Sequence, residues 1–349
     1  MLRNRSILSE SVAVQLDRVG EGMARGRPTA EVVKMALHAL DPLPPHIIER
    51  ARHEIVERCG LHARSRRLCP SLDLAAKFVP ALARPSREDQ LRDVPGLEHL
   101  FLFHWDGFLR EAALNRLHEG ARSPFFFGAI VYRLNDWVWQ VRAAAARCAA
   151  RVFPATEPGV VAAAAVSLLG QTDSWSRWGD EAALLDDALC RPDVAEALAT
   201  WLRTARTGPM PRVLTYALRR PAMDRYLPSL ARESAMPAVR AKALGSLIDA
   251  RAAWPVGFGT KWIDKSHGLS RRVRIFHERP LDRVIALEEL VALGAADGAA
   301  PARRVAIEAL VRHHASLANA DRLVALFLRD KSPSIRERAE FVAKARASD

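Results

Sequence analysis

One short pattern recurs along the chain and constrains its fold more than any other feature. Each copy has an arginine, an alanine three residues later, and usually a leucine or small apolar residue four positions beyond the alanine. The copies are Arg110-Glu-Ala-Ala113-Leu-Asn-Arg-Leu117, Arg142-Ala-Ala-Ala145-Ala-Arg-Cys-Ala149, Arg240-Ala-Lys-Ala243-Leu-Gly-Ser-Leu247, Arg283-Val-Ile-Ala286-Leu-Glu-Glu-Leu290, Arg303-Arg-Val-Ala306-Ile-Glu-Ala-Leu310 and the weaker Arg336-Glu-Arg-Ala339. Because residues four apart share one face of an α-helix, the pattern predicts helices that pack closely through a small apolar face.

The spacing of the copies predicts a repeat array. Arg110 and Arg142 are about 32 residues apart, and Arg303 and Arg336 about 33. Periods in this range are typical of stacked helical repeats. Each arginine lies near the start of its helix, where it does not complement the helix dipole. We therefore expect it to bridge to an acidic or polar group of the neighbouring repeat.

Several copies begin with a turn that carries a helix-capping residue or a proline. The three clear examples are Asn135-Asp136-Trp137, Met236-Pro237-Ala238-Val239 and Lys331-Ser332-Pro333-Ser334. Aspartate and serine favour the N-cap position, and proline suits the first helical turn. An aspartate or proline followed by Val-Arg-x-x-Ala resembles the second helix of HEAT repeats, most clearly over residues 96–153 and 236–349. The resemblance implies an all-α protein, a right-handed α-solenoid of HEAT-like helical pairs.

Four regions follow from this interpretation. They are an N-terminal helical region over 1–95, HEAT-like repeats over 96–253 with a diverged middle part, a basic aromatic insert over 254–279, and C-terminal HEAT-like repeats over 280–349. The insert carries three glycines and two tryptophans, and a loop of this length within a repeat array is often functional. We predict an irregular loop and a binding site here. The alternative is a decorated repeat whose aromatic side chains pack back on the helices.

The candidate binding residues of the insert combine positive charge with aromatic rings. Its basic residues outnumber its two acidic residues, Asp264 and Glu278. The predicted binding residues are Trp254, Lys261, Trp262, Lys265, Arg271, Arg272 and Arg274. Basic side chains contact phosphates, and aromatic rings stack on bases. If nucleic acid is the partner, we expect Arg64, Arg66, Arg67, Arg219, Arg220, Arg271, Arg272 and Arg274 to converge on one face.

The overall charge gives an ambiguous indication of the partner. The formal net charge is +12 and the sequence pI is about 10.3. Such a balance suggests a polyanion. Only seven of the basic residues are lysines, however, so the excess of arginine is also consistent with a biased genome composition. With no apolar run of about 20 residues and no signal-peptide pattern at the start, we expect a cytoplasmic location and no membrane partner.

A second candidate site carries four further tryptophans. Asn135-Asp136-Trp137-Val-Trp139-Gln140-Val-Arg142 and Trp175-Ser-Arg177-Trp178-Gly-Asp180 resemble, in inverted order, stretches of the helical-repeat alkylpurine DNA glycosylases. The resemblance implies a basic face that holds a duplex, with Trp137, Trp139, Arg142, Trp175, Trp178 and Asp180 near the DNA. Alternatively, these tryptophans cover the edge of the core and fill a turn.

No motif indicates catalysis or a cofactor. Gly257-Phe258-Gly259-Thr260-Lys261 lacks the spacing of a phosphate-binding loop. Cys59 and Cys69 flank His62, but no fourth zinc ligand is evident, so we expect no metal. We predict that Cys148 is a small core residue. The adjacent His313 and His314 point in different directions on a helix.

The sequence therefore favours a non-enzymatic binding or scaffold protein that uses the concave face of a helical-repeat solenoid to bind a protein partner. The alternative is a nucleic-acid-binding HEAT-like protein, including a DNA glycosylase-like repair protein. A regulatory subunit that docks through the insert is a third hypothesis.

Overall fold

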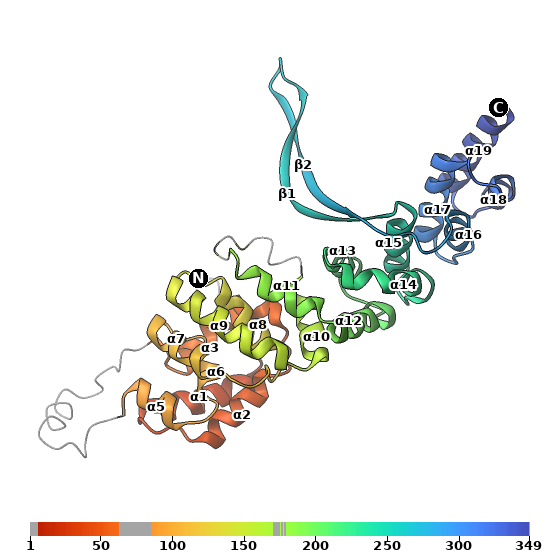
Figure 1. Cartoon of the computed structure of the whole chain (residues 1–349). Coiled ribbons are helices and arrows are strands. Elements are labelled where there is room, and N and C mark those ends of the chain that lie inside the picture. Colours follow the sequence, from red (N-terminus) through yellow and green to blue (C-terminus); the bar gives the residue numbers. More distant parts are fainter. Residues whose placement is uncertain (1–5, 63–84, 170–174, 176, 178, 349) are drawn as a thin grey trace, which may run out of the picture. The chain divides into compact units, whose positions relative to one another are not determined.

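The computed structural model describes residues 6–62, 85–169, 175, 177 and 179–348 (Figure 1). Most of these residues are helical, which confirms the prediction of a mainly helical protein. The chain divides into two compact units, Met1–Leu189 and Cys190–Asp349. None of the described helices has the length and apolar character needed to cross a bilayer.

The first unit is helical throughout its described part. Its helices are α1 (Glu10–Ala24), α2 (Ala30–Leu40), α3 (Ile48–Arg58), α5 (Arg87–Asp93), α6 (Leu97–Phe101), α7 (Gly107–Arg116), α8 (Pro124–Leu134), α9 (Trp139–Ala155), α10 (Pro158–Leu168) and α11 (Ala182–Cys190), with a 3₁₀ turn at Pro45–Ile47. Residues 63–84, part of the predicted N-terminal helical region over 1–95, lie outside the described residues.

The second unit combines helices with one antiparallel hairpin. Its elements are α12 (Pro192–Thr204), α13 (Met210–Ala217), a 3₁₀ turn at Pro221–Tyr226, α14 (Leu227–Glu233), α15 (Pro237–Ile248), β1 (Arg251–Asp264), β2 (Leu269–Pro280), α16 (Leu287–Ala295), α17 (Ala300–His313), α18 (Ala320–Phe327) and α19 (Pro333–Ser348).

Local sequence explains where several helices begin. The Ser123 side chain accepts a hydrogen bond from the Phe126 amide at 3.4 Å, and Pro124 occupies the first turn of α8. Both features favour a helix start. Phe125, Phe126 and Phe127 follow and are all buried, so the aromatic run forms a core and not a surface.

Each unit packs its helices in consecutive pairs. In the first unit, α9 contacts both α7 and α8. In the second unit, α14 pairs with α15, α16 with α17, and α18 with α19. The later members of these pairs also contact one another, α15 with α17 and α17 with α19. The alanines of the recurring pattern explain the close approach, because they are fully buried at Ala113, Ala145, Ala243, Ala306 and Ala339.

Three of the six arginines of the pattern, Arg110, Arg240 and Arg303, link neighbouring pairs, as the sequence predicts for the whole set. Arg303 donates from Nε to Asp330 Oδ2 at 2.6 Å and from Nη2 to Oδ1 at 3.2 Å. Its Nη1 donates to the carbonyl oxygens of Asp297 and Gly298, at 3.0 and 2.9 Å. Asp330 in turn caps the next turn by accepting from the Ser332 amide at 2.7 Å. One guanidinium therefore ties three segments of backbone together.

The same link occurs at two other places. Arg240 bonds both oxygens of Asp297, at 2.7 and 2.9 Å, and Arg110 bonds both oxygens of Asp136, at 3.1 and 3.0 Å. Such bidentate pairs fix geometry as well as adding energy. We call this arrangement the arginine–aspartate link. The aspartate side chains are at most 10 % exposed.

Arg283 does not take the same position, which corrects its assignment as a repeat copy. It lies between β2 and α16, before the helix, and donates to the carbonyl oxygens of Leu247 and Ile248 at the end of α15. Ala286 is exposed at the N-cap of α16, whereas the other pattern alanines are buried. The pattern matches here by chance because arginine and alanine are abundant.

The segment expected to be an irregular loop forms the hairpin of β1 and β2, so that prediction was wrong. Every second residue from Trp254 to Trp262 is aromatic or β-branched, the alternation typical of a strand. The strands pair in antiparallel register from Arg251↔Pro280 to Asp264↔Leu269, with irregularities after Pro255 and Trp262. Gly268 closes the turn with φ +65°, a conformation that favours glycine.

Removing one arginine–aspartate link is expected to destabilise the second unit. Asp330→Ala removes the acceptor of Arg303 Nε, Arg303 Nη2 and the Ser332 amide, at a cost of about 2–4 kcal/mol in the free energy of unfolding. Denaturant unfolding of the purified chain measures this.

The matched control is Asp321→Ala. Asp321 also pairs with an arginine, Arg346, but its side chain is 84 % exposed, so its loss should barely shift the unfolding midpoint. Equal effects of the two substitutions would contradict a structural role for the link.

Candidate functional site

Two surfaces carry the predicted site residues, one in each unit. The first is the basic hairpin, which we define as residues 251–280. Most of it projects from the helices and is exposed (Figure 1). Its base is anchored to the helical body, because Arg279 bonds both oxygens of Asp224 and donates to the Leu218 carbonyl at 3.1 Å.

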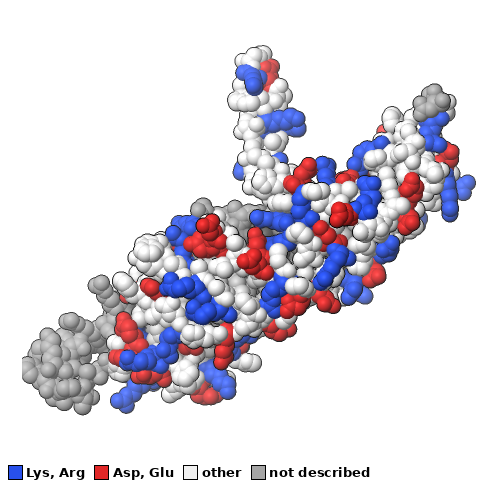
Figure 2. Space-filling view, in the orientation of Figure 1, with Lys and Arg blue, Asp and Glu red and all other residues white. Residues whose placement is uncertain are grey.

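The outer part of the basic hairpin holds unneutralised positive charge. Arg251 pairs with Glu278 at 3.0 Å near the base, and Asp264 accepts hydrogen bonds from Ser266 and His267 in the turn. Five other cations have no carboxylate partner within the part of the chain that the structure describes: Lys261, Lys265, Arg271, Arg272 and Arg274. Figure 2 shows basic side chains along the projecting hairpin, with acidic atoms near its turn.

One face of the basic hairpin combines these cations with aromatic rings. Arg274 lies opposite Phe258, and Arg272 opposite Thr260, in the strand register. The Arg272 guanidinium lies 3.9 Å from the centre of the Phe258 ring, a cation–π contact. Phe258 is 52 % exposed, and Trp262, on the same face, is 51 % exposed. Because side chains alternate along a strand, Lys261 and Arg271 lie on the opposite face.

The exposure of the aromatic rings shows which of them pack back on the helices. Trp254, near the base, is half-buried and its ring is edge-on to that of His277 at 6.4 Å. Trp262 and Phe258 are exposed in the outer part. The packing-back interpretation thus fits Trp254 and does not fit Trp262.

The arginines expected to converge on one face are only partly placed there. Arg272 and Arg274 share one face of β2, whereas Arg271 lies on the other face of the hairpin. Arg219 is exposed in the turn after α13. Arg220 is buried and donates to the Tyr216 carbonyl at 3.3 Å, so it is not a surface cation. Arg64, Arg66 and Arg67 lie outside the described residues.

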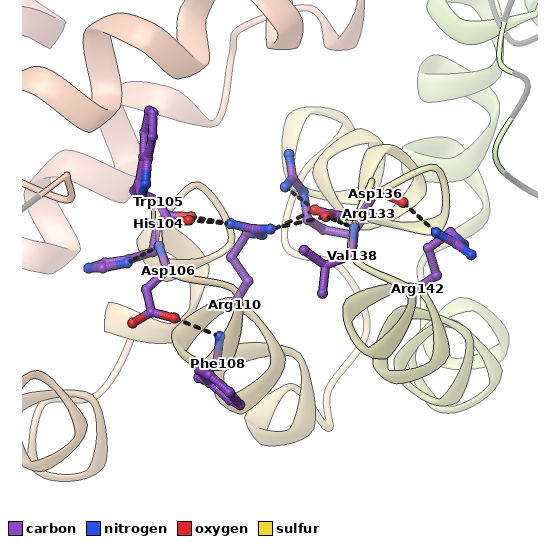
Figure 3. A network of polar contacts seen from close by, with 9 residues as sticks. All are labelled: His104, Trp105, Asp106, Phe108, Arg110, Arg133, Asp136, Val138 and Arg142. Atoms are coloured by element: carbon purple, nitrogen blue, oxygen red, sulfur yellow. Dashed lines mark hydrogen bonds and ion pairs between the residues drawn. The ribbon is translucent and has the colours of Figure 1, made fainter.

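The second surface is built around the buried carboxylate of Asp136 in the first unit (Figure 3). Asp136 Oδ1 accepts from Arg110 Nη2 and from the Val138 amide, both at 3.0 Å. Its Oδ2 accepts from Arg110 Nε at 3.1 Å and from Arg133 Nη1 at 2.5 Å. A carboxylate offers about four acceptor positions, so all are used. Asp136 is therefore a structural anion here and has no acceptor position left for a ligand.

Two cations share this one anion, so the network keeps a net positive charge. Burial lowers the pKa of Arg133 to about 10, but the nearby carboxylate of Asp136 opposes that effect. Arg133 therefore stays charged at neutral pH although its side chain is only 6 % exposed. Its guanidinium also lies over the ring of Tyr132, at 4.6 Å from the ring centre.

His104 lies beside this network as a neutral hydrogen-bond donor. The Asp106 amide donates to His104 Nδ1 at 2.9 Å, so the neutral ring carries its proton on Nε2. Burial, reinforced by the positive charges of Arg87 and Arg110, lowers the pKa of His104 to about 4. The Nε2 atom is buried and has no hydrogen-bond partner in the described part of the chain.

Two cavities of about 1010 and 990 Å³ flank this region. His62, His104, Trp105 and Trp137 line both of them. The first also contains Phe108 and the carboxylates of Glu88, Asp106 and Glu111. The second contains Arg52, Tyr132, Arg133, Trp175 and Arg177, with Glu49 and Glu57. We call the second cavity the tryptophan cleft.

The structure brings together only some of the residues of the predicted tryptophan site. Trp137 is 72 % exposed at both cavities, and Trp175 lies edge-on to Tyr132 at 5.9 Å in the tryptophan cleft. Trp139 is exposed but lines neither cavity. Arg142 donates to the Asp136 carbonyl at 2.9 Å and pairs with Glu181 at 3.9 Å. Asp180 is exposed, and Trp178 lies outside the described residues.

Sequence reasoning missed Trp105 and His104. Trp105 is 75 % exposed and lies five residues before Arg110, as Trp137 lies five residues before Arg142. Comparing residues at equal offsets from the pattern arginines would have found it. No sequence signal marks His104, because its properties depend on burial.

Two of the described cysteines, Cys59 and Cys148, are buried. Cys59 is buried and donates from Sγ to the Leu16 carbonyl, and burial raises the pKa of its thiol. Cys69 lies outside the described residues. Cys148 is buried in α9, as predicted for a core residue, and burial raises the pKa of its thiol to about 12.

No protein-family description matches the chain, and no curated protein matches its sequence.

The lowered pKa of His104 predicts a pH-dependent contribution to stability. Between about pH 6.5 and 4 the unfolded state binds a proton at this ring and the folded state does not. Stability from this group is therefore lost as pH falls through that window, by at most about 3 kcal/mol. His104→Asn, whose Oδ1 can accept from the Asp106 amide, should lose less stability on acidification than the parent chain. A ring that titrates near pH 6.5 by NMR would contradict the prediction.

Proposed function

We propose that the chain is a non-enzymatic binding protein, a right-handed α-solenoid of HEAT-like helical pairs whose basic hairpin binds double-stranded nucleic acid. The architecture is supported by the recurring arginine–aspartate link and by consecutive helical pairs within each unit. The choice of partner rests on one observation: five cations without carboxylate partners among the described residues lie on an exposed two-stranded ribbon.

The shape of the basic hairpin suits a nucleic-acid duplex. The major groove of B-form DNA is wide enough to admit a two-stranded β-ribbon. Lys261 and Arg271 on one face, with Arg272 and Arg274 on the other, would face the phosphates on both sides of such a groove. Counterion release from neutralised phosphates then supplies a favourable free energy that requires no particular base sequence.

Apart from the contact of Arg272 with the Phe258 ring, the isolated chain gains nothing evident from this charge arrangement. Like charges in adjacent positions repel, and the usual way to reduce that repulsion is a carboxylate neighbour. The base of the hairpin follows this rule at Arg251 and Arg279, whereas the outer part does not. A polyanionic partner would provide the missing countercharge, which favours binding over a purely structural role.

A protein partner is the second candidate, as expected for a scaffold. Ile263 and Leu269, which flank the turn, are 67 % and 56 % exposed. Exposed aliphatic residues at the end of a projecting ribbon suit a hydrophobic pocket of another protein, and its free strand edges can pair with another strand. In that case the cations would set specificity and not affinity.

The decisive experiment is fluorescence anisotropy of a labelled DNA duplex across a salt series. The parent chain should bind with micromolar or tighter affinity at near-physiological salt. The variant that combines Arg271→Glu, Arg272→Glu and Arg274→Glu should bind at least about tenfold more weakly. The slope of log affinity against log salt should fall by about 0.9 for each phosphate that the hairpin no longer neutralises.

The matched control places the same charge change elsewhere in the second unit. Arg304 in α17, Arg322 in α18 and Arg329 in the turn after α18 are exposed, and replacing all three with glutamate alters net charge by the same amount. This control should lose much less affinity than the hairpin variant. Equal losses would mean generic electrostatic attraction, and no duplex binding at about 0.15 M salt would favour the protein partner.

A further inference from the structure

The tryptophan cleft in the first unit presents a pair of aromatic residues that the repeat itself does not require. Trp105 and Trp137 each lie five residues before an arginine of the recurring pattern, Arg110 and Arg142. In the second unit the same offset is occupied by Ala235, Gly298 and Lys331. The arginine–aspartate link forms in both units, so tryptophan at this offset is not needed for folding.

The two rings are also unusually exposed for such large apolar groups. Trp105 is 75 % exposed and Trp137 is 72 % exposed. They precede the neighbouring helices α7 and α9, which pack directly against each other. Helices in such contact lie about 8–10 Å apart. The first unit therefore offers two aromatic platforms at corresponding positions of adjacent helices, with the tryptophan cleft beside them.

The polar groups at this cleft are mainly donors. Arg133 retains its charge although nearly buried, Arg52 lies with its guanidinium 6.0 Å from the centre of the Tyr132 ring, and the Nε atoms of both lack hydrogen-bond partners in the described residues. His104 adds an Nε2–H that has no partner there either. Asp136 has no acceptor position left, and Glu49 and Glu57 are exposed side chains at the margin.

These features identify the ligand by its chemistry. Exposed tryptophans stack on planar rings, and the donors require carbonyl, carboxylate or phosphate oxygens. An excess of donors around a buried network of net positive charge disfavours a cationic ligand. Two platforms on adjacent helices suit a ligand with successive rings joined by an anionic backbone.

We infer that the tryptophan cleft binds unpaired bases of single-stranded nucleic acid. Trp105 and Trp137 stack on two bases, while Arg52, Arg133 and His104 donate to base carbonyl or phosphate oxygens. This site is separate from the basic hairpin and does not depend on the hairpin's partner.

The test uses a labelled oligothymidine of about 12 nucleotides, a length within the range that single-strand sites cover. Fluorescence anisotropy at near-physiological salt compares it with an abasic strand of equal length, which keeps the phosphates but has no bases. The oligothymidine should bind at least about tenfold more tightly to the full chain, since stacking on each base contributes to affinity. Equal binding of the two strands would overturn the proposal, because it would leave phosphates as the sole contact.

The variant that combines Trp105→Ala with Trp137→Ala should bind oligothymidine about 25-fold more weakly, since each stacked base contributes about fivefold or more. Both side chains are exposed, so folding should be kept, which circular dichroism verifies. Trp139→Ala is the matched control: it is 64 % exposed, begins α9 and lines neither cavity. If the double variant binds as tightly as this control, the tryptophans are not the platform.

Two further measurements distinguish the cleft from the hairpin and from a mononucleotide pocket. The hairpin variant with three glutamates should keep the preference for oligothymidine over the abasic strand, even where its overall affinity falls. Loss of that preference would mean that the hairpin contacts the bases, and it would overturn the proposal. Thymidine monophosphate should bind far more weakly than oligothymidine. Equal affinity of the two ligands would overturn the proposal of a single-strand site and indicate a mononucleotide pocket.

Discussion

The arginine–aspartate link is the interaction on which the rest of the structure depends. Each guanidinium satisfies a carboxylate and one or more backbone carbonyls at once, so it fixes the position of one helix relative to the turn before the next. At Arg303 this joins the carbonyls of Asp297 and Gly298 to the carboxylate of Asp330. Because the aspartates are nearly buried, removing one partner leaves an uncompensated charge, which is far more costly than removing a surface pair.

The same link shapes the site in the first unit. The guanidinium groups of Arg110 and Arg133 and the Val138 amide fill the acceptor positions of the Asp136 carboxylate. The positive charge that Asp136 does not neutralise remains at the wall of the tryptophan cleft. Trp105 and Trp137 owe their positions to the turns that the link fixes, since Arg110 bonds the Trp105 carbonyl at 2.8 Å. A recurring structural arrangement thus places aromatic rings at the surface without restricting which residue stands there, as Ala235 and Gly298 show in the second unit.

The basic hairpin is stabilised in a different way from the helices. It has no core of its own, and an isolated two-stranded ribbon is at best marginally stable in water. It is held at its base by Arg279 and by contacts of β1 with α13 and α15. Its outer part carries exposed rings and cations without carboxylate partners among the described residues, features that are unfavourable in isolation and useful for binding. This separation of an anchored base from an exposed tip is what makes the segment a suitable binding element.

The sequence by itself determined the helical character, the buried alanine face and the linking role of Arg110, Arg240 and Arg303, because these depend on local periodicity and on the need of a charged side chain for a partner. The alternation from Trp254 to Trp262 indicates a strand, but not its partner, because the two strands pair residues as far apart as Arg251 and Pro280. Nor did the sequence separate Arg283 from the true copies or identify His104. Those outcomes depend on burial and on which groups meet in space, and only the tertiary structure decided them.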